Sequence, residues 1–108
     1  RADKELLVHV VYSDETDTVY MYVDDYLRAP PDAPKTPRLL RRLMELNWSE
    51  LAPKLEWEPV HGRIRMSALM HTDSNFDRRA FRSLVHTLLA EADRRYPELA
   101  PLAAGAGD

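Results

Sequence analysis

Apolar and polar residues alternate near the start of the chain in a pattern that predicts a β-hairpin. Residues 5–12 and 17–23 are rich in β-branched and aromatic side chains, and the four residues between them are polar turn formers. One face of the first strand carries Leu6, Val8, Val10 and Tyr12, and the other carries Leu7, His9 and Val11. Both faces of this strand are therefore largely apolar.

A second hairpin is predicted after Pro53. Leu55 and Trp57 alternate with charged residues, and residues 59–62 supply turn chemistry. The return strand has one apolar side, formed by Ile64, Met66, Ala68 and Met70. Arg63, Arg65 and Ser67 occupy its other side, which is typical of a strand with one face in water.

Apolar side chains at three- and four-residue spacing predict two helices. The first begins with Thr36 as N-cap and ends near Asn47, and its apolar stripe consists of Leu39, Leu40, Leu43, Met44 and Leu46. The second begins with Ser74 as N-cap and ends at Pro97. Its apolar positions are Phe76, Ala80, Phe81, Leu84, Val85, Leu88, Leu89, Ala92 and Tyr96.

The order of these elements, ββαββα with short links, predicts an α+β fold. We expect a largely antiparallel sheet built from the two β-hairpins, with two helices on one face. Residues 1–99 form a single domain, in which the proline-rich stretch 29–35 is an internal linker. The alanine- and glycine-rich tail, residues 100–108, is predicted to be disordered.

The two-sided first strand predicts an apolar surface that two helices on one face cannot cover. If Leu6, Val8, Val10 and Tyr12 face the helices, the outer surface carries Leu7, His9, Val11, Tyr20 and Tyr22. A missing N-terminal element, a second copy of the chain or a client polypeptide could cover it. The alternative is a strand that is central in a two-sided core.

Composition narrows the class of protein. The 108 residues include 44% hydrophobic and 31% charged residues, and the net charge is −3, which disfavours generic nucleic-acid binding. No apolar run approaches the length that a membrane span requires. The absence of cysteine fits a reducing compartment, so we expect a cytoplasmic protein.

No residue pattern predicts catalysis, a cofactor or a metal site. The four histidines, His9, His61, His71 and His86, fall in a strand, a turn, a loop and a helix, without the spacing of a helical metal pair. Three glycines are too few for a phosphate-binding loop, and the acidic turn residues favour solubility. We therefore expect a protein that is not an enzyme.

Five arginine residues form an alternative candidate binding site. Arg78, Arg79 and Arg82 cluster early on the second helix, while Arg63 and Arg65 share a strand face. These residues form either a solvated face or a patch for an acidic partner. The corresponding alternative function is an arginine-dependent regulatory module that contacts nucleic acid or an acidic protein.

Four linked segments resemble the bacterial YbjN-like domain family, whose members share the fold of type III secretion chaperones. The segments are LLVHVVYSDETDTVYMYVDDYLRAP, LLRRLMELNW, KLEWEPVHGRIRMSALM and FDRRAFRSLVHTLLAEADRRYPEL. The most specific parts are residues 46–48, 58–62 and 96–97. Family members usually begin with a helix and a further strand, whereas this sequence opens almost directly in the hairpin.

The resemblance implies a noncatalytic chaperone-like or adaptor domain that commonly dimerises and holds protein segments. Our leading hypothesis is a cytoplasmic, homodimeric protein-binding domain. We expect it to hold a partner polypeptide through Leu7, His9, Val11, Tyr20 and Tyr22. Whether this surface serves dimerisation or client binding is left open at this point.

Overall fold

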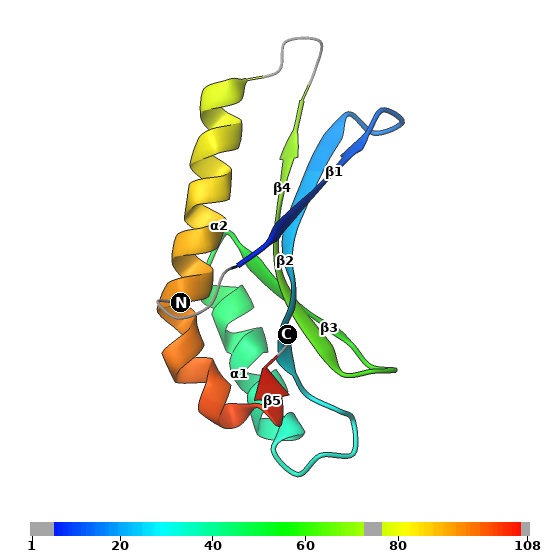
Figure 1. Cartoon of the computed structure of the whole chain (residues 1–108), viewed down its shortest axis with the longest axis vertical. Coiled ribbons are helices and arrows are strands. Elements are labelled where there is room, and N and C mark those ends of the chain that lie inside the picture. The colour runs from blue at the N-terminus through cyan, green and yellow to red at the C-terminus, as the bar shows by residue number, and fades with distance from the viewer. Residues whose placement is uncertain (1–5, 73–76, 107–108) are drawn as a thin grey trace.

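The computed structural model describes residues 6–72 and 77–106, and its element order confirms the predicted ββαββα arrangement. The elements are β1 (Val8–Ser13), β2 (Thr18–Arg28), α1 (Thr36–Ser49), β3 (Lys54–Glu58), β4 (Arg63–His71), α2 (Arg78–Leu99), the 3₁₀ turn η1 (Ala100–Leu102) and β5 (Gly105–Ala106). The fold class is α+β, with an antiparallel sheet and both helices on one side of it (Figure 1).

The sheet has the strand order β1-β2-β4-β3, with β5 pairing separately with β2. The eleven-residue β2 is the spine, because it pairs with β1 through residues 18–23 and with β4 along most of its length. The register shifts between Val23 and Leu27, where Asp25 has a φ of 51°. Beyond this irregularity, β5 pairs with Leu27 and Arg28.

The core lies between the helices and the inner face of β2, β3 and β4. Leu39, Leu43 and Leu46 of α1 are buried, as are Leu88, Ala92 and Leu99 of α2. They pack with Met21, Leu27, Leu55, Ile64 and Met66 of the sheet. The leucine spacing that predicted α1 therefore marks the helix face that is removed from water.

The helices leave the part of β1 that contains Val10 and Tyr12 uncovered. α1 packs on β3, and α2 packs on β2 and β4. Val10 and Tyr12 share the inner face with buried Met21 and Val19, their partners in β2, yet they are 49% and 59% exposed. Leu6 and Val8, on the same face, are partly buried against the core, so the expectation that the helices shield this face is wrong only at Val10 and Tyr12. Local periodicity sets a strand's faces but not how far a helix layer reaches across the sheet.

Both helix starts differ from the predicted ones. Lys35 occupies the N-cap position of α1, and Thr36 is already helical and buried, with its Oγ1 donating a hydrogen bond to the Pro30 carbonyl (2.7 Å). For α2 the N-cap is Asp77, whose carboxylate accepts from the backbone N–H groups of residues 79 and 80 (3.0 Å each). The predicted cap Ser74 and the predicted helix position Phe76 lie outside the described residues.

The predicted helix ends are also too early. α1 continues past Asn47 to Ser49, and α2 continues past Pro97 to Leu99. Proline removes one backbone donor, and in the last turn this loss leaves the preceding hydrogen bonds intact. Leu99 is fully buried, so packing favours completing that turn.

The C-terminal segment carries the 3₁₀ turn η1 and the strand β5 as far as residue 106, whereas its composition predicts a disordered tail. Ala103 is buried, the Ala104 N–H donates to the Arg28 carbonyl (3.0 Å), and Lys35 Nζ donates to the Pro101 carbonyl (3.2 Å). Small residues allow the segment to pass close to the sheet, a property that composition alone does not distinguish from disorder. Residues 107 and 108 lie outside the described part of the chain.

Candidate protein-binding surfaces

β1 is an edge strand that exposes both of its faces. Within the described residues it pairs only with β2, so its other edge presents unpaired backbone donors and acceptors. Its inner face exposes Val10 and Tyr12, and its outer face exposes Val11 (50%). Leu7, which precedes the strand, is 65% exposed. We call these four residues the β1 surface.

The outer-face residues predicted from the sequence are brought together. His9 lies opposite Tyr22 and Val11 lies opposite Tyr20 in the β1–β2 register. The rings of His9 and Tyr22 stack with centroids 5.0 Å apart. Leu69, a residue not included in the predicted site, lies opposite Tyr20 on β4 and is 50% exposed. Val11, Tyr20 and Leu69 therefore form a row across three strands, in which Val11 and Leu69 are exposed and Tyr20 is half-buried.

A polar layer covers the two tyrosines on this outer face. The guanidinium of Arg65 lies 5.3 Å from the ring centre of Tyr20 and 4.9 Å from that of Tyr22, within the range of cation–π attraction. Arg65 also donates to Glu56 (2.9 Å), which accepts a second hydrogen bond from the Tyr20 hydroxyl (2.5 Å). The outer face is consequently less apolar than the strand pattern predicts.

The same contacts shift two pKa values in opposite directions. Burial, followed by the hydrogen bond to Glu56, raises the pKa of Tyr20. Burial opposes ionisation of Glu56, but hydrogen bonds from Tyr20, Arg65 and Ser67 together lower the pKa of this carboxyl below its ordinary value. The layer is therefore a neutral phenol, a carboxylate and a guanidinium at pH 7.

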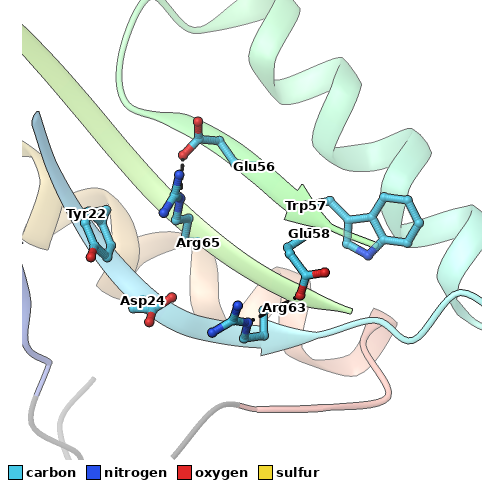
Figure 2. A pocket seen from close by; sticks show the side chains of 7 residues that line it. All are labelled: Tyr22, Asp24, Glu56, Trp57, Glu58, Arg63 and Arg65. Carbon is cyan, nitrogen blue, oxygen red and sulfur yellow. Dashed lines mark hydrogen bonds and ion pairs between the residues drawn. The ribbon is translucent and has the colours of Figure 1, made fainter. Parts of the chain in front are cut away.

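A polar cavity of about 410 Å³ lies beside this layer, as Figure 2 shows. Its lining consists of Tyr22, Asp24, Glu56, Trp57, Glu58, Arg63 and Arg65. Both arginines are already ion-paired, Arg65 with Glu56 (2.9 Å) and Arg63 with Glu58 (3.4 Å). The cavity therefore offers no uncompensated cation to an anionic ligand.

A second exposed apolar surface lies on α1 and the residues after it. Met44 is 69% exposed, Trp48 is 92% exposed and Leu51 is 94% exposed. Spacings of four and three residues place Met44 and Trp48 on one helix face and bring Leu51 just beyond its end. We call these residues the α1 surface. The apolar spacing predicts Met44 as part of the core stripe and does not predict Trp48 and Leu51 as a surface, although their spacing from Met44 is the signal that could have indicated it.

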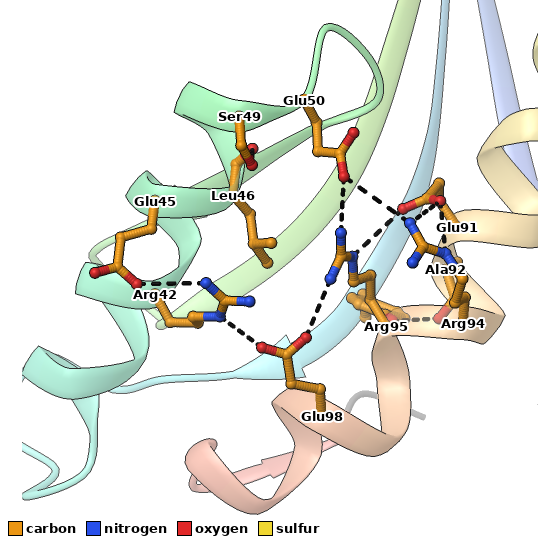
Figure 3. Close-up of polar contacts among 11 residues, drawn as sticks. Arg42, Glu45, Leu46, Ser49, Glu50, Glu91, Ala92, Arg94, Arg95 and Glu98 are labelled. Carbon is orange, nitrogen blue, oxygen red and sulfur yellow. Dashed lines mark hydrogen bonds and ion pairs between the residues drawn. The ribbon is translucent and has the colours of Figure 1, made fainter.

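An ion-pair network fixes the end of α1 that carries this surface (Figure 3). Arg95 of α2 is 16% exposed and contacts Glu50 (2.7 Å), Glu98 (3.2 Å) and Glu91 (3.5 Å). Glu50 follows α1 directly, and its backbone N–H donates to the Leu46 carbonyl (2.9 Å). The network therefore ties the segment between Trp48 and Leu51 to α2.

The five arginines of the predicted acidic-partner patch lie in two separate places. Arg63 and Arg65 lie on the outer face of β4, opposite to the face on which Ile64 and Met66 are buried under the helices. Arg78, Arg79 and Arg82 are exposed on the first turns of α2, on the helix side of the sheet. These last three residues form what we call the arginine cluster.

The described residues contain no group of histidine, aspartate and glutamate side chains arranged to hold a metal ion. His61 lies 3.3 Å from Glu58 in the β3–β4 turn, while His9, His71 and His86 are exposed on three different elements. Over residues 6–72 and 77–106, no helix has the length and apolar character required to cross a bilayer.

The architecture is similar to that of a solved protein structure, although no sequence match supports a family. No family model and no curated protein sequence matches the chain. The structure is similar to a solved structure of the ExsC-ExsE complex, with a TM-score of 0.67 and 16% sequence identity over 90% of this chain and 71% of that chain. The chain thus shares the α+β fold of the chain that it matches in that complex.

Proposed function

We propose that the chain is a noncatalytic, chaperone-like protein-binding domain of the YbjN-like type, which holds an extended segment of a partner polypeptide on the β1 surface. The observation that carries this proposal is an edge strand with three exposed apolar side chains on its two faces, Val10, Val11 and Tyr12. Such an edge pairs readily with another strand, and proteins normally protect it.

The geometry favours an added strand over a folded partner. A strand laid against β1 gains backbone hydrogen bonds along six residues and places alternate side chains beside Val10 on one face and Val11 on the other. The outer row continues to Tyr20 and Leu69, which extends the apolar contact. The similarity to a chain solved in the ExsC-ExsE complex supports a protein partner.

A short strand peptide tests the proposal. The probe is a fluorescent peptide of six alternating valine and threonine residues between serine flanks, and binding is followed by polarisation. We expect the double variant Val10→Asp, Val11→Asp to lose at least tenfold in affinity, because a carboxylate on each face opposes burial. Val60→Asp is the matched control, since Val60 is 79% exposed in the β3–β4 turn.

Amide hydrogen exchange locates the contact. Binding should protect the alternate backbone N–H groups of residues 8–13 that point to the open edge rather than to β2, and it should protect them more than those of β3. Protection confined to another element, or equal affinity of the double variant and the wild type, would refute the β1 surface as the binding site.

The domain also acts as a homodimer, and we assign that contact to the α1 surface. Trp48 is 92% exposed and Leu51, three residues later, is 94% exposed, and an indole alone buries about 200 Å² in an interface. If two copies pair through antiparallel α1 helices, Trp48 of each lies against Met44 of the other, as a two-fold axis requires. Arg41, one turn earlier on the same face, then reaches the partner's indole.

This dimer leaves the β1 surface open. α1 packs on β3, and β3 and β1 are at opposite edges of the strand order β1-β2-β4-β3. Light scattering should therefore give about 25 kDa, twice the chain mass of 12.5 kDa, and Trp48→Glu should return it to one chain. The Val11→Asp variant should keep the dimer mass. If Val11→Asp is instead monomeric and Trp48→Glu remains dimeric, the dimer interface lies on the sheet and not on the α1 surface.

A further inference from the structure

A stack of rings on the outer face of the sheet ends at the edge strand. The imidazole of His9 on β1 lies against the phenol ring of Tyr22 on β2, with centroids 5.0 Å apart and ring planes 14° from parallel. The guanidinium of Arg65 on β4 lies 4.9 Å from the centre of the same phenol ring (Figure 2). Because β2 lies between β1 and β4, the Tyr22 ring separates His9 from Arg65. The stack therefore has a guanidinium on one side and an imidazole on the other.

The imidazole side of the stack is open. His9 is exposed, and within the described residues β1 has no neighbouring strand on the edge away from β2. One face of the imidazole contacts Tyr22, and no ring of the described chain covers the other face. The uncovered face thus lies at the edge where the proposed partner strand would pair with β1.

The β1–β2 pair shows the geometry that an added strand would repeat. Adjacent strands lie about 4.8 Å apart, and side chains at paired positions point to the same face of the sheet. This spacing accounts for the 5.0 Å separation of the His9 and Tyr22 rings. A partner residue paired with His9 would lie at the same spacing on its other side, so an aromatic ring at that position would stack on the uncovered imidazole face.

The charges along this edge favour an uncharged partner side chain at that position. Neither His9 nor Val11, at the centre of the outer face of β1, carries a fixed charge. The guanidinium of Arg65 is paired with Glu56 (2.9 Å), and Arg65 lies two strands away from the open edge. Asp24 lies beyond the part of β2 that pairs with β1, residues 18–23. A charged partner side chain beside His9 would therefore lose water without gaining a counter-ion on β1.

We infer that the partner segment carries an aromatic side chain at the position paired with His9, where its ring extends the stack onto the added strand. An aromatic pair in this geometry gains more than the free energy of the area that it buries, and an aliphatic side chain does not. The inference rests on the proposed function, and it adds the chemical class of one partner side chain. His9 is accordingly the residue that selects this side chain.

Single substitutions in the strand peptide test the inference. Each position of the alternating valine–threonine peptide carries phenylalanine in one version and cyclohexylalanine in another, because the register of the added strand is not fixed. Cyclohexylalanine is similar in size and at least as apolar, but it has no π-system. At the position paired with His9, the phenylalanine version should bind about fivefold more tightly than the cyclohexylalanine version, as expected from the stacking of an aromatic pair.

Variants of the protein assign this preference to one residue. His9→Val should abolish the preference and keep the affinity for the parent peptide within about twofold, whereas His9→Phe, which restores a ring, should retain the preference. Tyr12, exposed on the inner face of β1, also offers a ring to the partner, so the preference that counts is the part that His9→Val removes. His71→Val is the matched control and should change nothing, because His71 is exposed on the same outer face at the end of β4 and is paired with Thr18.

The outcomes separate the inference from the proposed function. If the parent peptide binds but no position prefers phenylalanine, or if His9→Val keeps the preference, the inference is wrong and the proposed function stands. If no version of the peptide binds, the β1 proposal fails and the inference fails with it. Two further versions carry glutamate or lysine at the position that depends on His9, and both should bind more weakly than the parent peptide. Tighter binding of either one than of the phenylalanine version would overturn the inference in favour of a charged partner side chain.

Discussion

Arg95→Met should destabilise the fold much more than Arg94→Met, although the two arginines are neighbours in one network. Arg95 is 16% exposed and contacts three carboxylates, whereas Arg94 is 57% exposed and has one close partner, Glu91. Methionine keeps much of the apolar stem and removes the charge. Loss of Arg95 therefore leaves Glu50, Glu91 and Glu98 as neighbouring negative charges without their central cation.

The expected magnitude lies between two limits. Removing one partner of a fully buried pair costs about 3–5 kcal/mol, and removing an exposed pair costs about 0–1 kcal/mol. The carboxylates around Arg95 are 20–37% exposed, so we expect about 2 kcal/mol for Arg95→Met and about 0.5 kcal/mol for Arg94→Met. For a domain of this size, about 2 kcal/mol lowers Tm by roughly 10 °C.

Urea unfolding followed by circular dichroism measures both variants at pH 7. The measurements are made in a Trp48→Glu background, so that dimerisation does not add to the apparent stability. In 1 M salt, the loss in free energy of unfolding caused by Arg94→Met should shrink by a larger fraction than the loss caused by Arg95→Met, because the Arg95 side chain is less exposed to the screening ions. Equal losses in the two variants would refute the view that Arg95 is the centre of the network.

Three further predictions follow from single features of the structure. A hydrogen bond from Arg42 lowers the pKa of Glu98 in the folded state, so ionised Glu98 stabilises the fold at pH values above the ordinary glutamate pKa. This stabilisation is lost as pH falls through the lowered pKa. Urea titrations from pH 6 to 3 should therefore show a decline in the free energy of unfolding that is shallower in Glu98→Gln than in the wild type. Gly62→Ala should destabilise by more than about 2 kcal/mol, because Gly62 has a φ of +74° and a Cβ would lie 2.5 Å from a backbone nitrogen of the linker; a Tm within 2 °C of the wild type would contradict this. Arg78→Glu with Arg79→Glu should raise stability by about 1 kcal/mol through the helix dipole, and a lower Tm in low salt would show that these arginines support the fold.

The sequence predicted the elements and the pairing of the outer face well, because both depend on local periodicity. Leu39, Leu43 and Leu46 are buried as their spacing indicates, and Tyr20 and Tyr22 face the side that strand alternation assigns to them. The polar layer over these tyrosines was less accessible to prediction. It depends on β4 lying beside β2, which places Arg65 over both rings, and that neighbour relation is a property of the topology.

The α1 surface and the exposed inner face of β1 escaped prediction for a related reason. A helical stripe identifies apolar positions but does not say how many of them the rest of the fold can cover. Met44 counted as a core position in the pattern, whereas the structure leaves it 69% exposed. Tyr12 similarly lies beyond the reach of both helices, since they pack on the other strands.

The attachment of residues 100–106 links the completion of the fold to the progress of translation. Pro101 and Ala104 contact Lys35 and Arg28, which leave the ribosome many residues earlier, and β5 pairs with the far end of β2. A nascent chain that stops before residue 101 has therefore made every major helix and strand but lacks the contacts of this C-terminal segment with Lys35 and with β2. The contacts of residues 101–106 with the linker and with β2 form only after that short segment has emerged.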